Sequence, residues 1–398
     1  MFDALHAIVD GAVRSGRNCQ RTRDIHTLLM ADARVREILE IEIPVIADVS
    51  EILEVSAGKV LAVRMDEAYG ITGFKKPVIA SLILKRLVEA VVRRRKQNTK
   101  WMDGGNVNSS LALAYYAKKF GGKATYVMSR FFPDYVLDYI RDVSEKSIDL
   151  IRAPNLSLGI ERDFYRHLVD LIRNDSTYRT FQPLWHAKYG GTYTRCLGKE
   201  LANKLNVCPD YIVTAIGAGS NLVGHAIPIR ERFRNVPRIV VPEHSRSRLL
   251  NTQNTTQSAE STTARQKAFP SNWFSRPPNG IPHYVIGPHY DEINPLIGVE
   301  ALACIGGVFG YADEDWMQMS FDCGSRGMEI GNSSAANLVA AKRLAREGRT
   351  VLTFIYEPFR SIYKGHNLSK REERAETRHP TVKGQGIAPL SVKQAVGR

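Results

Sequence analysis

Cysteine is scarce and scattered in this sequence, and none of its cysteines belongs to a C-x-x-C pair. The five among 398 residues are Cys19, Cys196, Cys208, Cys304 and Cys323. This number and spacing indicate neither a disulfide framework nor a zinc cluster. The pair of Cys19 and His26 could ligate haem or a metal only with further ligands, so we expect no metal site.

Long apolar runs are missing as well. No stretch reaches the roughly 18 to 20 residues that a membrane helix needs. The first segment, MFDALHAIVDGAVRSGRN, carries an aspartate inside its short apolar stretch and lacks a convincing cleavage site. We therefore expect a cytoplasmic protein that does not enter a membrane.

Acidic residues are outnumbered by basic ones, which gives a formal net charge of +14. A basic surface attracts anions, and nucleic acid is one candidate partner. Much of the excess lies in Arg93–Lys96 and in the tail 370–398, where no aromatic residues are interleaved for base stacking. A solvated helix end and a flexible tail explain this charge better, so nucleic acid stays the lesser alternative.

The remaining composition is that of a globular protein, with 43% hydrophobic residues over a length that allows two domains. Residues 1–43 have apolar positions at helical spacing and are predicted to form a helical extension, either a cap or a partner surface. Residues 251–282 are polar and low in complexity, which indicates a surface insertion. The polar, basic tail 369–398 is predicted to be disordered.

Between these segments, predicted strands and helices alternate. We expect a helical piece in SEILEVSAGK, a strand in VLAVRM, helices over 77–95 and 109–120 with a turn at 103–108 between them, and a strand from Lys123. DYIVTAI, RIVVPEHS and TVLTFIYEP read as further strands. Such alternation predicts an α/β fold of mainly parallel sheets with helices on both faces.

A glycine-rich turn, GAGSNLVG at 217–224, follows the strand YIVTAI directly and precedes a predicted helix. Glycines let backbone N–H groups close around an anion, Ser220 and Asn221 can add side-chain donors, and the helix N-terminus contributes its positive end. The turn suits a phosphate group. A tight strand-to-helix connection needs glycine in any case, so this motif alone leaves both readings open.

Three other segments carry polar residues at turns. In DGGNVNSS, two glycines and Asn106 stand at the mouth of a helix, where free N–H groups can hold a carboxylate, although an ordinary Asn/Gly turn explains them equally well. In GFKKP, Lys75 and Lys76 precede an apolar helix, and surface lysine is the default interpretation. In NSSAANLVAA, Ser333 and Ser334 start a helix of small residues that otherwise indicates close packing.

In their order along the chain, the four segments GFKKP, DGGNVNSS, GAGSNLVG and NSSAANLVAA resemble those of the fold-type II pyridoxal phosphate enzymes. The chain is identified as a divergent member of their cysteine synthase and cystathionine β-synthase-like family. The resemblance covers about residues 44–363. It implies a two-domain, tryptophan synthase β-like fold with pyridoxal 5′-phosphate in the cleft. The larger domain would comprise 44–67 and 181–368, and the smaller one 68–180. The family also implies a homodimer.

The resemblance gives these positions roles. Lys75 would bind the cofactor as a Schiff base and later remove the α-proton of the substrate. Asn106 would bond the cofactor's 3′-oxygen, and Ser333, with Ser334 as the alternative, would face its pyridine nitrogen. The phosphate would lie against Gly217, Ala218, Gly219, Ser220, Asn221 and Gly224. The substrate would lie against Gly104, Gly105, Val107, Asn108 and Gln182.

Two segments depart from the family pattern. Lys76 and Pro77 stand where the family has Asp-Arg, so a second cation that lowers the pKa of Lys75 or binds an anionic substrate is expected beside it. Gly104 and Val107 replace the hydroxyl residues of the carboxylate-binding turn, so substrate recognition must differ.

The function implied is β-replacement on an O-activated serine or related amino acid, through an aminoacrylate, with an amino acid substrate and a nucleophile as partners and a non-standard amino acid as a product. Deamination or dehydration and β-elimination by a lyase are the first alternatives. A non-catalytic binding protein that keeps the fold is another, because GFKKP departs from the family pattern.

Overall fold

The structure is a computed structural model that describes residues 2–15, 22–93, 100–129, 134–145, 147–153, 171, 179–181, 186–245, 250 and 297–357. Cys19, Gln182, the segment 251–282 and the tail 369–398 lie outside the described residues. Within the described part, no helix is both long and apolar enough to cross a membrane.

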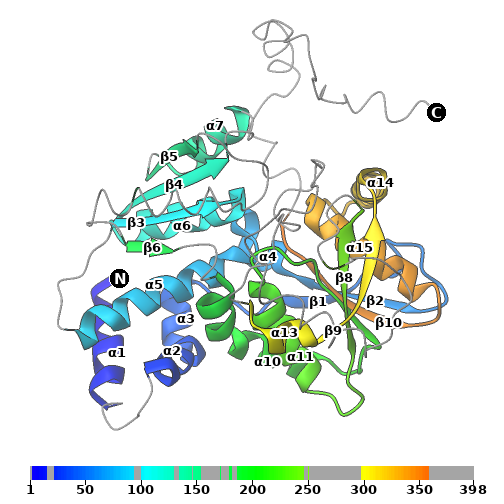
Figure 1. Cartoon of the computed structure of the whole chain (residues 1–398), viewed down its shortest axis with the longest axis horizontal. Coiled ribbons are helices and arrows are strands. Elements are labelled where there is room, and N and C mark those ends of the chain that lie inside the picture. The colour runs from blue at the N-terminus through cyan, green and yellow to red at the C-terminus, as the bar shows by residue number, and fades with distance from the viewer. Residues whose placement is uncertain are drawn as a thin grey trace, which may run out of the picture.

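The chain is built around two separate sheets (Figure 1). The larger has the strand order β1-β2-β10-β7-β8-β9, and the smaller has the order β5-β4-β3-β6. The strands are β1 (Val45–Asp48), β2 (Lys59–Arg64), β3 (Lys100–Gly105), β4 (Lys123–Ser129), β5 (Ile148–Ala153), β6 (Arg179–Phe181), β7 (Tyr211–Val213), β8 (Arg238–His244), β9 (Ile305–Tyr311) and β10 (Thr350–Ile355).

Helices cover both sheets and fill the space between them (Figure 1). They are α1 (Phe2–Ser15), α2 (Thr22–Ala31), α3 (Ala33–Leu39), α4 (Met65–Tyr69), α5 (Lys75–Val92), α6 (Val107–Lys119), α7 (Asp134–Val143), α10 (Arg195–Lys204), α11 (Ile227–Glu231), α13 (Val299–Ala303), α14 (Asp313–Ser325) and α15 (Asn332–Ala345). Shorter turns are the 3-10 helix η2 (Gly70–Thr72) and the π-helices η3 (His186–Gly191) and η4 (Leu222–Ala226).

The pairing confirms the predicted α/β fold with mainly parallel sheets. Only β1 pairs antiparallel among the described strands, against β2. Central strands are apolar on both faces because both faces are covered. In β10, Val351 and Ile355 pack with α14 and α15, whereas Leu352 and Phe354 pack toward the opposite core.

The N-terminal segment forms the predicted helices α1 to α3, which pack against one another and, through α1 and α2, against α5. Leu5, Val9 and Val13 line the buried stripe of α1. His26 lies in α2, where its ring stacks on Tyr193 with centroids 4.5 Å apart and planes 9° apart. This extension therefore acts as a cap on α5.

Two local predictions were wrong. Residues Ser50–Glu54 form a single turn and no helix, because Glu54 takes a left-handed conformation with φ 54° that ends it. Asp103, Gly104 and Gly105 were placed in a turn but belong to β3, which pairs in parallel with β4 on one side and β6 on the other. The turn begins only at Asn106, and α6 starts at Val107.

Candidate active site

Lys75 is the first residue of α5, and its amine is buried, with 2% of the residue exposed. Burial lowers the pKa of Lys75 to about 8, against an opposing effect of the Asp103 carboxylate. The positive end of α5 also disfavours an ammonium group in the first turn. A substantial fraction of this amine is therefore uncharged near pH 8 and able to act as a nucleophile or base.

Lys76 points away from that amine. Its Nζ lies 3.6 Å from Glu40 Oε2 in the cap and 4.6 Å from the centroid of the Tyr115 ring. The expectation that Lys76 lowers the pKa of Lys75 is wrong, because the lowering comes from burial. The second cation of the GFKKP turn is part of the contact between the cap and α6.

The glycine-rich turn 217–224 runs from the end of β7 into η4. Gly219 has φ +88°, which L side chains rarely adopt, and a Cβ there would lie 2.3 Å from Ile297 Cγ1. The Ser220 hydroxyl is buried and has no hydrogen-bond partner among the described residues. A buried polar group without a partner is costly, so this hydroxyl marks a place where a ligand would supply one.

Asn221 has partners within the protein. Its Nδ2 donates to Thr214 Oγ1 at 2.9 Å and to the Tyr356 hydroxyl at 3.3 Å. Both contacts lie on the β7 and β10 side of the turn, and the predicted contact of this side chain with a phosphate stays a prediction. Asn221 anchors the turn, which leaves the backbone N–H groups and Ser220 for an anion.

The end of β10 joins the lysine turn to the glycine-rich turn. A Cβ at Gly73 would lie 2.5 Å from the Tyr356 carbonyl oxygen, so the backbone before Lys75 packs directly on β10. The ring centroids of Phe74 and Tyr356 are 4.7 Å apart, and the Tyr356 hydroxyl lies 3.0 Å from Thr214 Oγ1. The lysine turn and Thr214, which follows β7, thus both contact Tyr356 at the end of β10.

The same strand end orders the start of α15. The backbone N–H of Tyr356 donates to Ser334 Oγ at 2.9 Å, and Ser334 is fully buried. Further along α15, Asn337 accepts from the backbone N–H of Ala215 and donates to the Phe354 carbonyl. Ser334 is thereby committed to the backbone, whereas the Ser333 hydroxyl contacts only its neighbour Asn332, at 3.4 Å, among the described residues.

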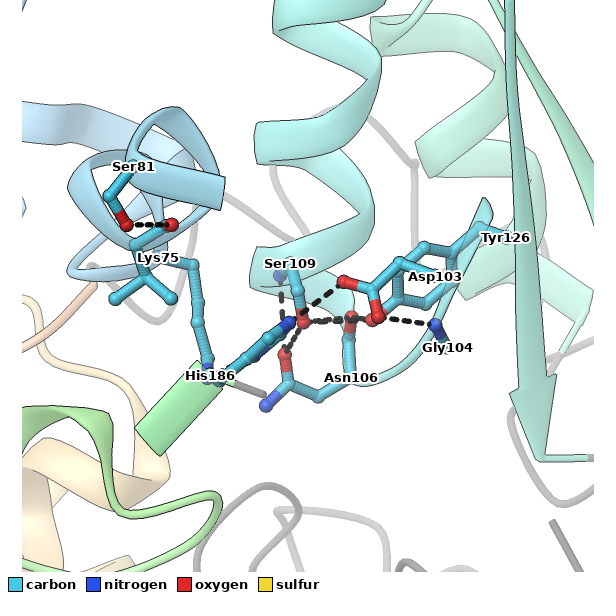
Figure 2. A network of polar contacts seen from close by, with 9 residues as sticks. Lys75, Ser81, Asp103, Gly104, Asn106, Ser109, Tyr126 and His186 are labelled. Carbon is cyan, nitrogen blue, oxygen red and sulfur yellow. Dashed lines mark hydrogen bonds and ion pairs between the residues drawn. The ribbon is translucent and has the colours of Figure 1, made fainter. Parts of the chain in front are cut away.

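Asn106 caps α6 on the side of the smaller sheet. Its Oδ1 accepts from the Ser109 backbone N–H at 3.2 Å and from the Ser109 hydroxyl at 2.7 Å. The Tyr126 hydroxyl in turn donates to Ser109 Oγ at 2.8 Å (Figure 2). Because these bonds hold the carbonyl end of the amide, the Nδ2 end is directed away from α6 in Figure 2.

One side chain of the predicted substrate turn contacts a residue that follows β10 of the larger sheet. Asn108 Nδ2 donates to Glu357 Oε2 at 2.9 Å. Burial raises the pKa of Glu357 to about 8, and the bond from Asn108 opposes that rise. Gly104 and Gly105 end β3 beside this contact, and Val107 is buried in the first turn of α6. Asn108 therefore already has a partner at the end of β10.

Two site residues were missed by the sequence interpretation. His186 begins η3, and its Nδ1 lies 3.1 Å from Lys75 Nζ. Its Nε2 lies 2.9 Å from Asp103 Oδ2, and Asp103 Oδ1 accepts from the Gly104 N–H at 2.8 Å (Figure 2). The only signal for His186 was a histidine shortly before the pair Gly190-Gly191, which is too common to single out.

The donor set of a pyridoxal phosphate site is present here. It consists of the buried amine of Lys75, the capping amide of Asn106 and the buried Ser220 hydroxyl, which has no partner among the described residues. A family model described as pyridoxal-phosphate dependent enzyme matches residues 54–355. The chain belongs to this family. It is therefore a pyridoxal phosphate-dependent enzyme, and the predicted cofactor is confirmed at the level of the family.

Solved structures agree on the fold. The chain is similar to an O-acetylserine dependent cystathionine beta-synthase from Helicobacter pylori, at 17% identity and a TM-score of 0.63, over 82% of this chain and 96% of that one. It is similar to an O-ureido-L-serine synthase at 16% identity and a TM-score of 0.60, over 84% and 94%. It is also similar to a hydrogen sulfide-producing enzyme from Fusobacterium nucleatum, at 16% identity and a TM-score of 0.63, over 81% of this chain and 98% of that one. No curated protein sequence matches the chain.

These relatives confirm the predicted cysteine synthase and cystathionine β-synthase-like, fold-type II architecture and a divergent member of it. The residues present also fit the cofactor. A reactive amine at Lys75 suits its aldehyde, and the turn at Gly219 and Ser220, whose buried hydroxyl has no partner in the described part of the chain, suits its phosphate.

Proposed function

We propose that this enzyme catalyses β-replacement on an O-activated serine or a closely related amino acid. The observation that carries the proposal is the buried amine of Lys75, which is 2% exposed and lies 3.1 Å from His186 Nδ1. The printed names of two structural relatives support the substrate class, since one depends on O-acetylserine and another makes O-ureido-L-serine.

Each residue of the site has a part in this proposal. Bound pyridoxal phosphate supplies an aldehyde that condenses with amines and a conjugated ring that withdraws electrons from the substrate α-carbon. Lys75 would hold the aldehyde, and its Nζ would take up the substrate α-proton. Asn106 Nδ2, whose orientation is fixed by Ser109, would donate to the cofactor's 3′-oxygen. The backbone of 217–224 and the Ser220 hydroxyl would bind the phosphate.

Ser333 is proposed to face the pyridine nitrogen. Ser334 is the weaker choice, because its hydroxyl already accepts a backbone bond from Tyr356. A neutral hydroxyl at this place leaves the ring nitrogen unprotonated and limits electron withdrawal by the ring. That restraint favours loss of a leaving group from the β-carbon over transamination.

The substrate carboxylate is proposed to bind the N–H groups at the start of α6, near Gly105 and Val107. Free N–H groups at a helix N-terminus hold anions without any charged side chain. Asn108 is already bonded to Glu357, so its side chain positions this turn from the larger sheet. This arrangement replaces the hydroxyl residues that the turn lacks.

The cofactor assignment is tested by borohydride reduction of the protein mixed with pyridoxal phosphate, followed by peptide mapping. We expect a phosphopyridoxyl group on Lys75 and none on Lys76. The Lys75→Ala variant should carry no label, whereas Lys76→Ala, the matched control, should be labelled like the natural protein. A phosphopyridoxyl group on Lys76, or on neither Lys75 nor Lys76, would contradict the assignment.

The reaction is tested with O-acetyl-L-serine offered with and without sulfide or an amine, the products being identified by mass spectrometry. β-Replacement gives a new amino acid only when the nucleophile is present. Release of a 2-oxo acid and ammonia at the same rate without a nucleophile would assign a deaminase or lyase reaction instead. The predicted homodimer and cytoplasmic location stay predictions.

A further inference from the structure

The three side chains Lys75, His186 and Asp103 form a continuous chain of short contacts in the interior. Lys75 Nζ lies 3.1 Å from His186 Nδ1, and His186 Nε2 lies 2.9 Å from Asp103 Oδ2. The three residues come from α5, η3 and β3, and they are exposed to 2%, 1% and 0%. Burying three ionisable groups together is costly unless each one balances another.

We propose that His186 accepts a proton from Lys75 Nζ and returns it, and that Asp103 positions the ring and balances its charge. This inference rests on the proposed role of Lys75 in binding the cofactor. It makes His186 a catalytic residue, because its Nδ1 contacts the reacting nitrogen, and Asp103 a positioning residue that acts through His186.

The tautomer of His186 follows from its two partners. When Asp103 is ionised, its Oδ2 accepts, so Nε2 carries the ring proton and donates it. Nδ1 then has a free lone pair directed at the Lys75 amine. The other oxygen of Asp103 is fixed by the Gly104 N–H at 2.8 Å, which prevents the carboxylate from turning away. The ring is thus held in the state that can accept a proton from lysine.

The proton transfer conserves charge within the trio. A Lys75 N–H bond breaks, its electron pair stays on Nζ, and a new N–H bond forms at His186 Nδ1. The ammonium and carboxylate before the transfer become an imidazolium and carboxylate after it, so the total charge is zero throughout. If the Nε2 proton then moves to Asp103, the three groups are all uncharged. Because the total charge is zero in every state, none of them buries a net charge.

The pKa values have the directions expected of such a trio. Burial lowers the pKa values of Lys75 and His186, and burial raises that of Asp103. All three directions favour the uncharged form of each group. Burial therefore favours the movement of a proton from Lys75 through His186 to Asp103, which leaves all three groups uncharged.

Other charged groups near the trio are already paired. On α5 itself, Lys76 faces Glu40. From α4, Asp66 bonds Arg64 at 2.7 Å, and from the end of β10, Glu357 accepts from Asn108. Asp103 is the charged residue that shifts the pKa of Lys75 in the described part of the chain. The titration of Lys75 therefore reports on this trio.

The test uses the full-length protein without cofactor, with its lysine side chains labelled with ¹⁵N. The Nζ signal of Lys75, assigned by comparison with Lys75→Met, is followed against pH. We expect a midpoint near pH 8 in the natural protein. Asp103→Asn should lower it, because the negative charge that raises the pKa of Lys75 is lost, and because the amide, donating to Nε2, turns the ring proton toward Lys75.

A second measurement follows chromophore formation when pyridoxal phosphate is added to the same proteins. His186→Leu should slow the rate of chromophore formation at saturating pyridoxal phosphate by about 100-fold, the low end of what a positioned acid–base group contributes. Asp103→Asn, which keeps size and shape, should slow it in the same direction. The matched control is His244→Leu, which removes another buried histidine whose Nε2 lies 3.3 Å from a carboxylate, that of Asp313.

The control should lose stability without changing either the Lys75 midpoint or the uptake rate. The inference is overturned if folded His186→Leu and Asp103→Asn proteins both keep the natural midpoint and the natural uptake rate. Failure of the proposed function looks different. In that case the natural protein forms no chromophore at all, while the ¹⁵N titration still decides whether the trio shares a proton.

Discussion

Replacing Gly219 by alanine tests the glycine-rich turn, because two separate penalties meet there. The residue has φ +88°, and a left-handed conformation costs an L-residue roughly 1 to 2 kcal/mol. The added Cβ would also lie 2.3 Å from Ile297 Cγ1 and 2.5 Å from its Cδ1. Overpacking of this kind costs about 1 to 3 kcal/mol when the neighbour must move. The expected loss of unfolding free energy is therefore about 2 to 5 kcal/mol.

Gly327→Ala is the matched control for the backbone penalty. Gly327 has φ +84°, and a Cβ there would meet nothing within 4 Å. Its loss should be about 1 to 2 kcal/mol, from conformation alone. The assay is urea unfolding of both cofactor-free variants, and the difference between them measures the clash with Ile297. Equal losses for the two variants would show that Ile297 moves aside freely.

The cofactor adds a second measurement on the same pair. If the turn shifts to relieve the clash, a backbone bond to the phosphate is weakened, which costs about 1.5 to 3 kcal/mol for a bond to a charged group. The Kd of pyridoxal phosphate should then rise by about 10- to 100-fold in Gly219→Ala and stay unchanged in Gly327→Ala. An unchanged Kd in both would refute the assignment of 217–224 as the phosphate site.

Further predictions concern the end of β10 and the lysine turn. Burial raises the pKa of Glu357 from 4.5 to about 8, so between these pH values the folded state holds a proton that the unfolded state has lost. As pH rises from 4.5 to about 8, this group therefore lowers the free energy of unfolding by on the order of 1.4 kcal/mol per pH unit. Glu357→Gln should remove that slope in urea unfolding at pH 5 to 8, and a parallel slope would contradict the reasoning. Asn337→Ala leaves a backbone N–H and a backbone carbonyl without partners and should cost about 2 to 6 kcal/mol, a loss below 1 kcal/mol being the contrary result. Lys76→Met should destabilise the protein by less than about 1 kcal/mol while its affinity for pyridoxal phosphate stays natural, since the Glu40 carboxylate of this pair is half exposed; a large loss of affinity would return Lys76 to the site.

The sequence determined the local features of this protein. Alternating apolar strands and helices were enough to predict the mainly parallel sheets, because the periods of buried strands and helices are written in neighbouring residues. The turns at Lys75, Asn106 and 217–224 were recognisable for the same reason, since glycine, asparagine and serine at turns act over a few residues. Their common order along the chain pointed to the family that the comparisons then showed.

Only the tertiary structure decided what each side chain contacts. Lys75 and Lys76 are neighbours in sequence, yet one is buried beside His186 and the other faces Glu40. Asp103 looked like a turn residue because its place inside a parallel sheet depends on two strands that pair with β3 from elsewhere in the chain.

The partners at the site are separated by long stretches of sequence. His186 is 111 residues from Lys75, and Asn108 is 249 residues from Glu357. No period or turn signal reaches over such distances, because these contacts arise from how the two sheets and α5 pack together. The sequence therefore identified the family and predicted Lys75 as its reactive lysine, whereas the packing determined which groups contact Lys75 and hold the turns around it.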